Sequence, residues 1–341
     1  MPGHDSPIAD LNKQAVFLVW GPPSHGPRSQ VFASELGIEE LHFIYATTKR
    51  GLLSAPLKYG YQAVQTLRLL FRKRPKIVFV QSPPSLAVLF VYIYCALTNS
   101  RYLVDAHSAA LLLPYWTRPV WLHSFLARQA VTTIVTNEHF QNTINAWGGS
   151  AFILRDIPTT FPLADAYRLN GNFSVVVVNT FSTDEPLQEV LEAAANLDGI
   201  QFYVTGKKSG AGQAVLAEVP GNVHLTDFLP AESYYALLNA SQAVMCLTRR
   251  NHTMQRGACE ALSLGKPIIT SDWPLLRMYF HKGTVHVPNT SDGIRQGVLR
   301  MKKHYGLFQA EIKALQIEQQ QEWHDKFVAL TALIRASIES P

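Results

Sequence analysis

The sequence has few cysteines and no long hydrophobic run. Its three cysteines, Cys95, Cys246 and Cys259, are odd in number and lie in apolar stretches. We expect them to be buried free thiols of a protein from a reducing compartment. The longest apolar run, residues 86–97, has about 12 residues, whereas a membrane-spanning helix needs about 20. We expect a buried helix there, with a shallow membrane contact as the alternative.

An excess of charge of one sign is also missing. Lys and Arg total 30 against 25 Asp and Glu, which gives a formal net charge of +5 among 341 residues. No Cys-x-x-Cys pair, zinc-finger spacing or RNA-binding motif accompanies this mild excess, so we expect no nucleic-acid partner. The polar start of the chain has no signal-peptide hydrophobic region, which favours a cytoplasmic protein.

Apolar runs alternate with helical stretches along most of the chain. Unbroken apolar runs of this length are typical of parallel strands buried on both faces. They occupy residues 15–21, 41–47, 76–82, 101–108 and 131–137, and then 172–180, 200–207, 222–229, 243–248 and 267–272. Strands alternating with helices predict right-handed βαβ units and doubly wound α/β sheets.

The pattern divides near residues 157–172, which hold prolines, a glycine and few periodic apolar residues. The length suits two domains of about 150 residues each. We expect Rossmann-like domains at 1–160 and 161–320, and a C-terminal helix at 321–341 that crosses back to the first domain. Two facing sheets would leave an interdomain cleft at the carboxyl ends of their strands, where ligands of such sheets bind.

The stretch RGACEALSLGKPIITSD, residues 256–272, places Glu260 in a helical segment before a buried strand. A carboxylate near the start of that helix can accept hydrogen bonds from a ribose diol. The N–H groups and dipole of the same helix end can hold a diphosphate. The alternative is a glutamate on a solvated helix face.

This stretch resembles the nucleotide-sugar-binding segment of family-4-like GT-B glycosyltransferases. Their pattern has another glutamate eight positions earlier, where this chain has His252. The segments GPPSHGPRSQVFASELG and VVVNTFSTDEPLQEVL, the Q-x-P-P at 81–84 and the D-x-H at 105–107 are similar to the β-1,4-mannosyltransferase family that acts on chitobiosyl-diphosphodolichol.

The resemblance implies the GT-B fold, with an acceptor-binding first domain and a donor-binding second domain. It implies transfer of a hexose from a GDP- or UDP-linked sugar to a glycan or a polyprenyl-diphosphate-linked sugar, with inversion. The Asp-x-Asp metal pair of the other large glycosyltransferase fold is missing. We therefore expect no metal and no cofactor besides the nucleotide sugar.

Two groups of candidate residues lie in the first half of the chain. Asp105 and His107 end the fourth apolar run, where either can take the proton of an acceptor hydroxyl. The alternative is a helix N-cap and a structural histidine. The loop after the first run is a candidate for acceptor or phosphate contact, or an ordinary turn; its residues are Gly21, Ser24, His25, Gly26 and Arg28.

Further candidates for donor binding follow the strands of the second half. Arg249 and Arg250, and also Lys207, can neutralise a leaving diphosphate, because arginine binds phosphate in a fork; the alternative is a solvated basic loop. Thr180 and Ser182 can contact phosphate, although their segment is more typical of a helix N-cap. His252 is a weaker candidate for sugar or phosphate contact.

Basic residues and apolar residues are interleaved in the first half. The basic ones are Lys49, Arg50, Lys58, Arg68, Arg72, Lys73, Arg74 and Lys76, and the apolar ones Tyr59, Tyr61, Leu67, Leu70 and Phe71. This profile is typical of a helix that lies on anionic lipid. A second apolar stretch, residues 111–128, is a candidate entrance for a lipid acceptor. We expect peripheral attachment to the cytoplasmic membrane face, or else core helices with basic edges.

Two other functions remain open. One is a GT-B epimerase or phosphorylase, which would use the same nucleotide or phosphate site without a lipid-facing surface. The other is a non-catalytic scaffold partner of a transferase, because the first glutamate of the pattern is missing.

Overall fold

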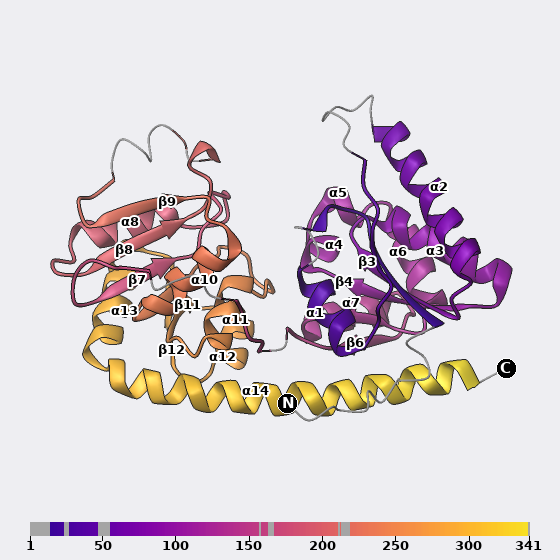
Figure 1. Cartoon of the computed structure of the whole chain (residues 1–341). Helices are drawn as coiled ribbons and strands as arrows, with labels where there is room; N and C mark the ends of the chain where they lie inside the picture. The colour runs from indigo at the N-terminus through magenta and orange to yellow at the C-terminus, as the bar shows by residue number, and fades with distance from the viewer. Residues whose placement is uncertain are drawn as a thin grey trace. The chain divides into compact units, whose positions relative to one another are not determined.

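The computed structural model describes residues 14–23, 27–46, 55–156, 158–162, 167–210, 212 and 219–339. Contacts group the chain into two compact units. The first unit is Met1–Asp156 with Trp323–Pro341, and the second unit is Ile157–Glu322. Figure 1 shows a sheet flanked by helices in each unit.

The first unit contains a six-stranded parallel sheet in the order β2-β1-β3-β4-β5-β6. Its strands are β1 (Ala15–Val19), β2 (Leu41–Phe43), β3 (Ile77–Ser82), β4 (Arg101–Ala106), β5 (Thr133–Val135) and β6 (Ala151–Ile153). Its helices are α1 (Pro27–Glu35), α2 (Ala55–Lys73), α3 (Ser85–Thr98), α4 (Ser108–Leu112), α5 (Pro114–Thr117), α6 (Val120–Gln129) and α7 (Glu138–Ala146).

The unbroken apolar strands of this sheet are buried on both faces. Val16 and Leu18 of β1 belong to a core cluster with residues of α2, α3, α6 and α7. The ring of Phe17 between them points to the other face, where it lies 6.1 Å from the ring of Phe32 in α1. Because successive side chains of a strand alternate between faces, an all-apolar strand needs helices on both sides.

The second unit contains another six-stranded parallel sheet, in the order β12-β11-β10-β7-β8-β9. Its strands are β7 (Ser174–Val177), β8 (Gln201–Thr205), β9 (Val223–Asp227), β10 (Ala243–Cys246), β11 (Ile268–Ser271) and β12 (Thr284–Val287). Its helices are α8 (Leu187–Ala195), the 3-10 turn η4 (Lys208–Gly210), α10 (Ala231–Ala240), α11 (Arg256–Ser263), α12 (Pro274–Tyr279) and α13 (Ser291–Lys303).

Two core clusters lie on opposite faces of this second sheet. Val175 and Val177 pack with residues of α8 and α13. Val176 packs with residues of α10, α11 and α14. The strand order is that of the Rossmann fold, in which the order reverses between the first and fourth strands of the sheet. The predicted α/β class with doubly wound sheets is therefore confirmed.

The last helix, α14 (Tyr305–Glu339), contributes residues to both units. Its buried side chains recur every three or four residues, as on one face of a helix; they are Phe308, Ile312, Leu315, Gln319, Trp323, Phe327, Leu330, Thr331 and Ile334. Gly283 makes room for this helix, because a Cβ atom there would lie 2.5 Å from the backbone nitrogen of Ile312.

The three cysteines are buried and form no disulfide, as predicted. The predicted helix at residues 86–97 is α3, and its side chains Val88, Val91 and Tyr94 lie in the core of the first unit. In the described part of the chain, no helix combines the length and the apolar character needed to cross a bilayer.

Candidate functional site

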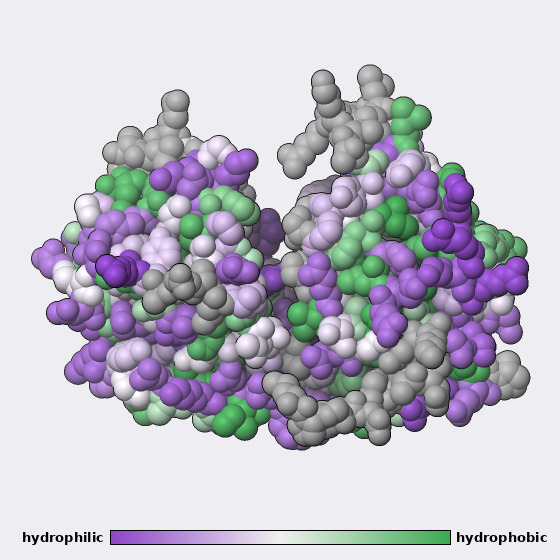
Figure 2. Space-filling model, in the orientation of Figure 1, coloured by the Kyte–Doolittle hydropathy of each residue, from purple (hydrophilic) through white to green (hydrophobic). Residues whose placement is uncertain are grey.

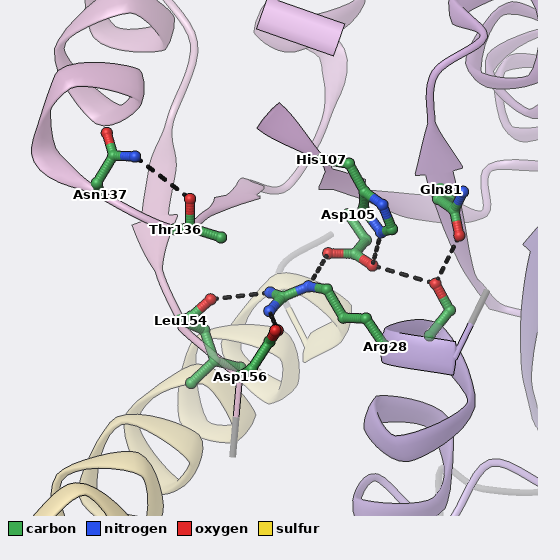
Figure 3. Close-up of polar contacts among 9 residues, drawn as sticks. Arg28, Gln81, Asp105, His107, Thr136, Asn137, Leu154 and Asp156 are labelled. Carbon is green, nitrogen blue, oxygen red and sulfur yellow. Dashed lines mark hydrogen bonds and ion pairs between the residues drawn. The ribbon is translucent and has the colours of Figure 1, made fainter. Parts of the chain in front are cut away.

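The strand order of the first sheet reverses between β1 and β3. Ligands of open parallel sheets bind outside the carboxyl ends of the strands at such a point. The segments that begin there are the loop into α1, the Ser82–Pro84 turn after β3 and the residues after β4. At this edge Arg28 and Ser29 of α1, Gln81 of β3, Asp105 of β4 and His107 after β4 form one connected cluster, shown in Figure 3.

Asp105 lies at the centre of this cluster with no exposed surface. Its Oδ1 accepts a hydrogen bond from Arg28 Nε at 3.2 Å, and its Oδ2 accepts one from Ser29 Oγ at 3.3 Å. Ser29 Oγ also lies 2.9 Å from Gln81 Oε1. Burial by itself would raise the pKa of Asp105, but Arg28 and His107 outweigh it and hold that pKa well below the usual range.

These contacts show the surroundings of two predicted site residues. Asp105 is enclosed, charged and fully partnered, so it is not placed to take a proton from an acceptor. Arg28 is also occupied, because its guanidinium binds Asp105, the carboxylate of Asp156 and the carbonyl oxygen of Leu154, the last at 2.8 Å. It therefore joins α1 to β4 and to the segment after β6, and its guanidinium is occupied by these partners.

His107 remains available at this edge of the sheet. It precedes α4, its side chain is 25% exposed, and its Nε2 lies 3.4 Å from Asp105 Oδ2. Nε2 is buried, so the exposed part of the ring is its other edge. The predicted alternative of an N-cap aspartate is not observed, since the N-cap residue of α4 is His107, which makes no side-chain cap bond.

The remaining predicted residues of this half lie in the loop after β1. Gly21 is buried. Ser24, His25 and Gly26 lie outside the described residues, so their predicted contact with an acceptor or a phosphate stays a prediction.

In the second sheet the order reverses between β7 and β10. The loops after these two strands hold most of the predicted donor-binding residues. They are tied together by Asp184, whose carbonyl oxygen accepts the Arg249 N–H at 2.7 Å. The carboxylate of Asp184 also lies 3.1 Å from Arg250 Nη2 and accepts a hydrogen bond from Thr248 Oγ1 at 3.2 Å.

Arg249 and Arg250 are half exposed, with side-chain exposures of 48% and 42%. Arg249 pairs with the carboxylate of Glu189 in α8, and Arg250 with Asp184. Both guanidinium groups therefore lie at the predicted position, next to the point where the strand order reverses. An anion that bound them would compete with these two carboxylates.

Thr180 and Ser182 donate hydrogen bonds to a carboxylate of the same loop. The carboxylate of Glu185 accepts hydrogen bonds from the Thr180 N–H at 2.8 Å, the Ser182 N–H at 3.0 Å and Thr180 Oγ1 at 3.1 Å. Burial raises the pKa of Glu185. The predicted side-chain N-cap is wrong, because α8 begins after Pro186, which makes no side-chain cap bond. The two N–H groups form a small anion nest that Glu185 fills.

Three residues other than glycine have left-handed backbone dihedrals at the carboxyl edge of this sheet. They are Phe181 after β7, Asp227 at the end of β9 and His252 after β10, with φ of 60°, 63° and 61°. Such conformations are uncommon for residues other than glycine, although Asp and His adopt them more readily than most, and they gather at functional sites. The predicted residue Lys207 is exposed in the loop after β8 and carries its charge at the same edge.

Glu260 differs most from our prediction. It is the fifth residue of α11 and is 7% exposed. Its carboxylate accepts hydrogen bonds from the Tyr234 hydroxyl at 2.7 Å, the Tyr235 hydroxyl at 3.4 Å and Arg256 Nε at 2.6 Å. Burial, and then the neighbouring Glu260, raise the pKa of Tyr234 well above its usual value. A ribose diol would have to replace one of these donors, so Glu260 is not an open ribose site.

The described residues contain no group of three or more His, Cys, Asp or Glu side chains that could hold a metal ion.

Comparison with known proteins adds a family match in the second half. Residues 184–324 match the family model described as glycosyl transferase-like. This segment includes Asp184, Arg249, Arg250 and Glu260. A search of curated protein sequences finds no significant match.

Solved structures match nearly the whole chain. A sucrose-phosphate synthase from Thermosynechococcus elongatus has a TM-score of 0.73 at 13% identity, over 96% of this chain and 100% of its own. The chain has the GT-B fold. Anabaena HepE, solved with UDP and glucose, has a TM-score of 0.67 at 12% identity, over 96% and 97%. A putative UDP-N-acetylglucosamine 2-epimerase from Listeria monocytogenes has a TM-score of 0.60 at 12% identity, over 88% of this chain and 91% of its own.

The sequence reasoning missed the acidic partners of the GT-B chain. Asp156, Glu185 and Glu189 each meet a predicted cation or N–H group. The contact of Glu185 could have been predicted, because a turn can bring a carboxylate five residues after Thr180 back to the Thr180 N–H. Asp156 and Glu189 gave no comparable signal, because they meet arginines 128 and 60 positions away along the chain.

Proposed function

We propose that the protein is a glycosyltransferase that moves a hexose from a GDP- or UDP-linked sugar to a glycan or polyprenyl-diphosphate-linked sugar. The observation that carries this proposal is the match of residues 184–324 to a glycosyl transferase-like family. Arg249 and Arg250 lie inside that segment, at the reversal of the strand order where the sheet is expected to bind its ligand.

The acceptor hydroxyl is activated by His107. As its oxygen attacks the anomeric carbon, the hydroxyl proton passes to the imidazole, and the bond between that carbon and the diphosphate oxygen breaks. Asp105 stands 3.4 Å behind the ring and stabilises the imidazolium that forms. The attack occurs opposite the leaving group, so the anomeric centre is inverted.

The departing diphosphate carries the charge that develops in the transition state. Electrostatic stabilisation by preorganised charges is usually the largest single contribution to lowering the barrier of such a reaction. Arg249 and Arg250 supply two guanidinium groups, and Lys207 an ammonium group at the same edge of the sheet. These residues act without a metal ion in this proposal.

A membrane surface is the proposed place of action. Four side chains of α2 are exposed along one stripe, namely Leu57, Tyr61, Val64 and Phe71, at 76%, 51%, 63% and 45%. Their spacing of three, four and seven residues repeats on one face of a helix. Tyr59 and Leu67 instead pack against the core, and Leu70 is buried there, so the lipid-facing stripe differs from the predicted one.

Basic residues flank this stripe. Lys58, Arg68 and Arg72 lie in α2, and Arg74 follows it, while Lys49 and Arg50 lie outside the described residues. Figure 2 shows apolar and hydrophilic residues side by side along the part of the first unit that Figure 1 labels α2. An apolar stripe with basic edges suits a peripheral contact with anionic lipid on the cytoplasmic face. Tyr115, Val120 and Trp121 in the second apolar stretch are exposed too and suit a lipid acceptor.

An assay with separate donor and acceptor panels tests the proposal. GDP- and UDP-hexoses are each incubated with the protein, with and without polyprenyl-diphosphate-linked chitobiose or free glycans. Sugar transfer that needs both substrates is the expected result. Conversion of the nucleotide sugar without any acceptor would replace the proposal with an epimerase, a class that shares the fold at a TM-score of 0.60. Donor binding without turnover would favour the scaffold function.

A further inference from the structure

Phe228 is an exposed aromatic side chain at the carboxyl edge of the second sheet. It follows β9 directly and is 74% exposed, the highest value among the large apolar residues described in the second unit. The other exposed apolar residues of this unit, Met278, Leu299, Leu307 and Ile317, lie in the helices α12, α13 and α14.

Hydrogen bonds to Asp227 constrain the backbone around Phe228, whose ring is exposed. Asp227 has a left-handed φ of 63°, and its Oδ1 accepts the N–H groups of Lys208 and Phe228, both at 2.9 Å. On the other side, Leu229 packs against the core. The left-handed φ of Asp227 and the two hydrogen bonds to its carboxylate constrain the backbone at Phe228.

Phe228 lies at the same edge of the sheet as the point where the strand order reverses. β9 lies two strands from β7 in the sheet order β10-β7-β8-β9. Neighbouring strands are about 4.8 Å apart, so the ends of β7 and β9 are about 10 Å apart. In sheets of this order the phosphates of a nucleotide lie at the reversal and its nucleoside extends over the carboxyl ends of the following strands.

We propose that Phe228 is the platform on which the base of the nucleotide donor stacks. The inference rests on the proposed function, since it names the part of the donor that this edge recognises. The backbone N–H groups of Lys208 and Phe228 share the Asp227 carboxylate, and Lys207 precedes Lys208 in the loop after β8. This edge of the sheet therefore offers basic residues for phosphates and an exposed ring for an aromatic base. Stacking on one ring face tolerates different bases, because every base has a π face. Hydrogen bonds elsewhere must choose among bases.

Binding measurements on the full chain separate the base from the phosphates. UDP, GDP and pyrophosphate are titrated calorimetrically into wild-type protein, Phe228→Ala, Phe228→Trp and Ile317→Ala. Ile317 is a matched control, because it is 69% exposed in the same unit and lies in a helix. Phe228→Ala should weaken UDP and GDP about 5- to 100-fold and leave pyrophosphate unchanged. Phe228→Trp and Ile317→Ala should bind like the wild type.

Three results would overturn the inference. Equal affinity of wild type and Phe228→Ala for both nucleotides would remove the stacking role and leave the proposed function standing. Weaker binding of pyrophosphate by the same factor would indicate a disturbed loop in place of a lost platform. If the wild-type protein bound pyrophosphate but neither nucleotide, both the proposed nucleotide-sugar donor and the stacking role of Phe228 would be excluded.

Discussion

The hydroxyl of Tyr234 donates a hydrogen bond of 2.7 Å to the carboxylate of Glu260, inside the packing of α10 against α11. We predicted Glu260 as a ribose ligand, but its carboxylate oxygen already accepts a hydrogen bond from Tyr234. A phenol hydroxyl and a ribose hydroxyl are the same kind of donor to a carboxylate. Tyr234 therefore stands where a ribose hydroxyl would have to bind.

Tyr234→Phe should expose this oxygen. If Glu260 accepts a ribose hydroxyl during donor binding, the variant no longer has to break the Tyr234 bond, and its affinity for UDP or GDP should rise about three- to tenfold, the worth of about one hydrogen bond. Calorimetric titration measures this change, with Tyr305→Phe as the matched tyrosine control. Unchanged affinity would make Glu260 a purely structural residue.

Asp105→Asn should destabilise the first unit. Removing the charge leaves Arg28 without its buried partner, which costs about 3 kcal/mol of unfolding free energy. The folded pKa of Asp105 is lowered, so its contribution is complete above the unfolded value of about 3.9 and is lost as the pH falls below it. In urea titrations between pH 5 and 2 the wild type should lose stability more steeply than Asp105→Asn. Parallel curves, as expected for the exposed control Asp198→Asn, would contradict the pairing.

His107→Gln should lower the turnover number for sugar transfer and leave the KM for the nucleotide sugar almost unchanged. A positioned general base contributes about 10²- to 10⁴-fold, and glutamine cannot take the proton. Steady-state kinetics with saturating acceptor provide the measurement. His324→Gln on α14 is the control and should behave as the wild type. A variant that retains full turnover would exclude His107 as the base.

Glu185→Ala should empty the anion nest after β7. The N–H groups of Thr180 and Ser182 lose their internal acceptor, and one carboxylate disappears next to Asp184. We expect pyrophosphate to bind several-fold more tightly, because two donors and less repulsion then face it. Isothermal titration tests this, and Glu192→Ala in α8 should have no effect. A weaker pyrophosphate complex would show that Glu185 shapes the loop for its ligand.

Leu57→Glu with Val64→Glu should weaken attachment to anionic liposomes at least tenfold. Two apolar side chains are lost from the α2 stripe, and two negative charges oppose the lipid. Flotation with phosphatidylserine-containing vesicles measures binding, which should also fall with added salt. The matched variant Leu307→Glu with Ile317→Glu, altered at similarly exposed sites, should float as the wild type does. Equal loss in both variants would remove α2 as the contact.

Most strands could be predicted from the sequence because a short, unbroken apolar run is typical of a strand buried on both faces. β3 and β4 lie at the predicted runs to within two residues at each end. The edge strand β6, with the sequence AFI, and β12, with TVHV, were not predicted. Both strands lie at sheet edges and are short and only partly buried, so they lack the apolar run by which the other two edge strands, β2 and β9, were predicted.

The sequence by itself determined the α/β class, the two sheets and the edge at which polar residues gather. These follow from local patterns, namely apolar runs, turn residues and the rule that parallel strands end at one edge. Only the tertiary structure decided which of those residues are free. Asp105, Arg28 and Glu260 are engaged by partners far away in sequence, because charges that are removed from water must be paired with whatever the fold brings near them.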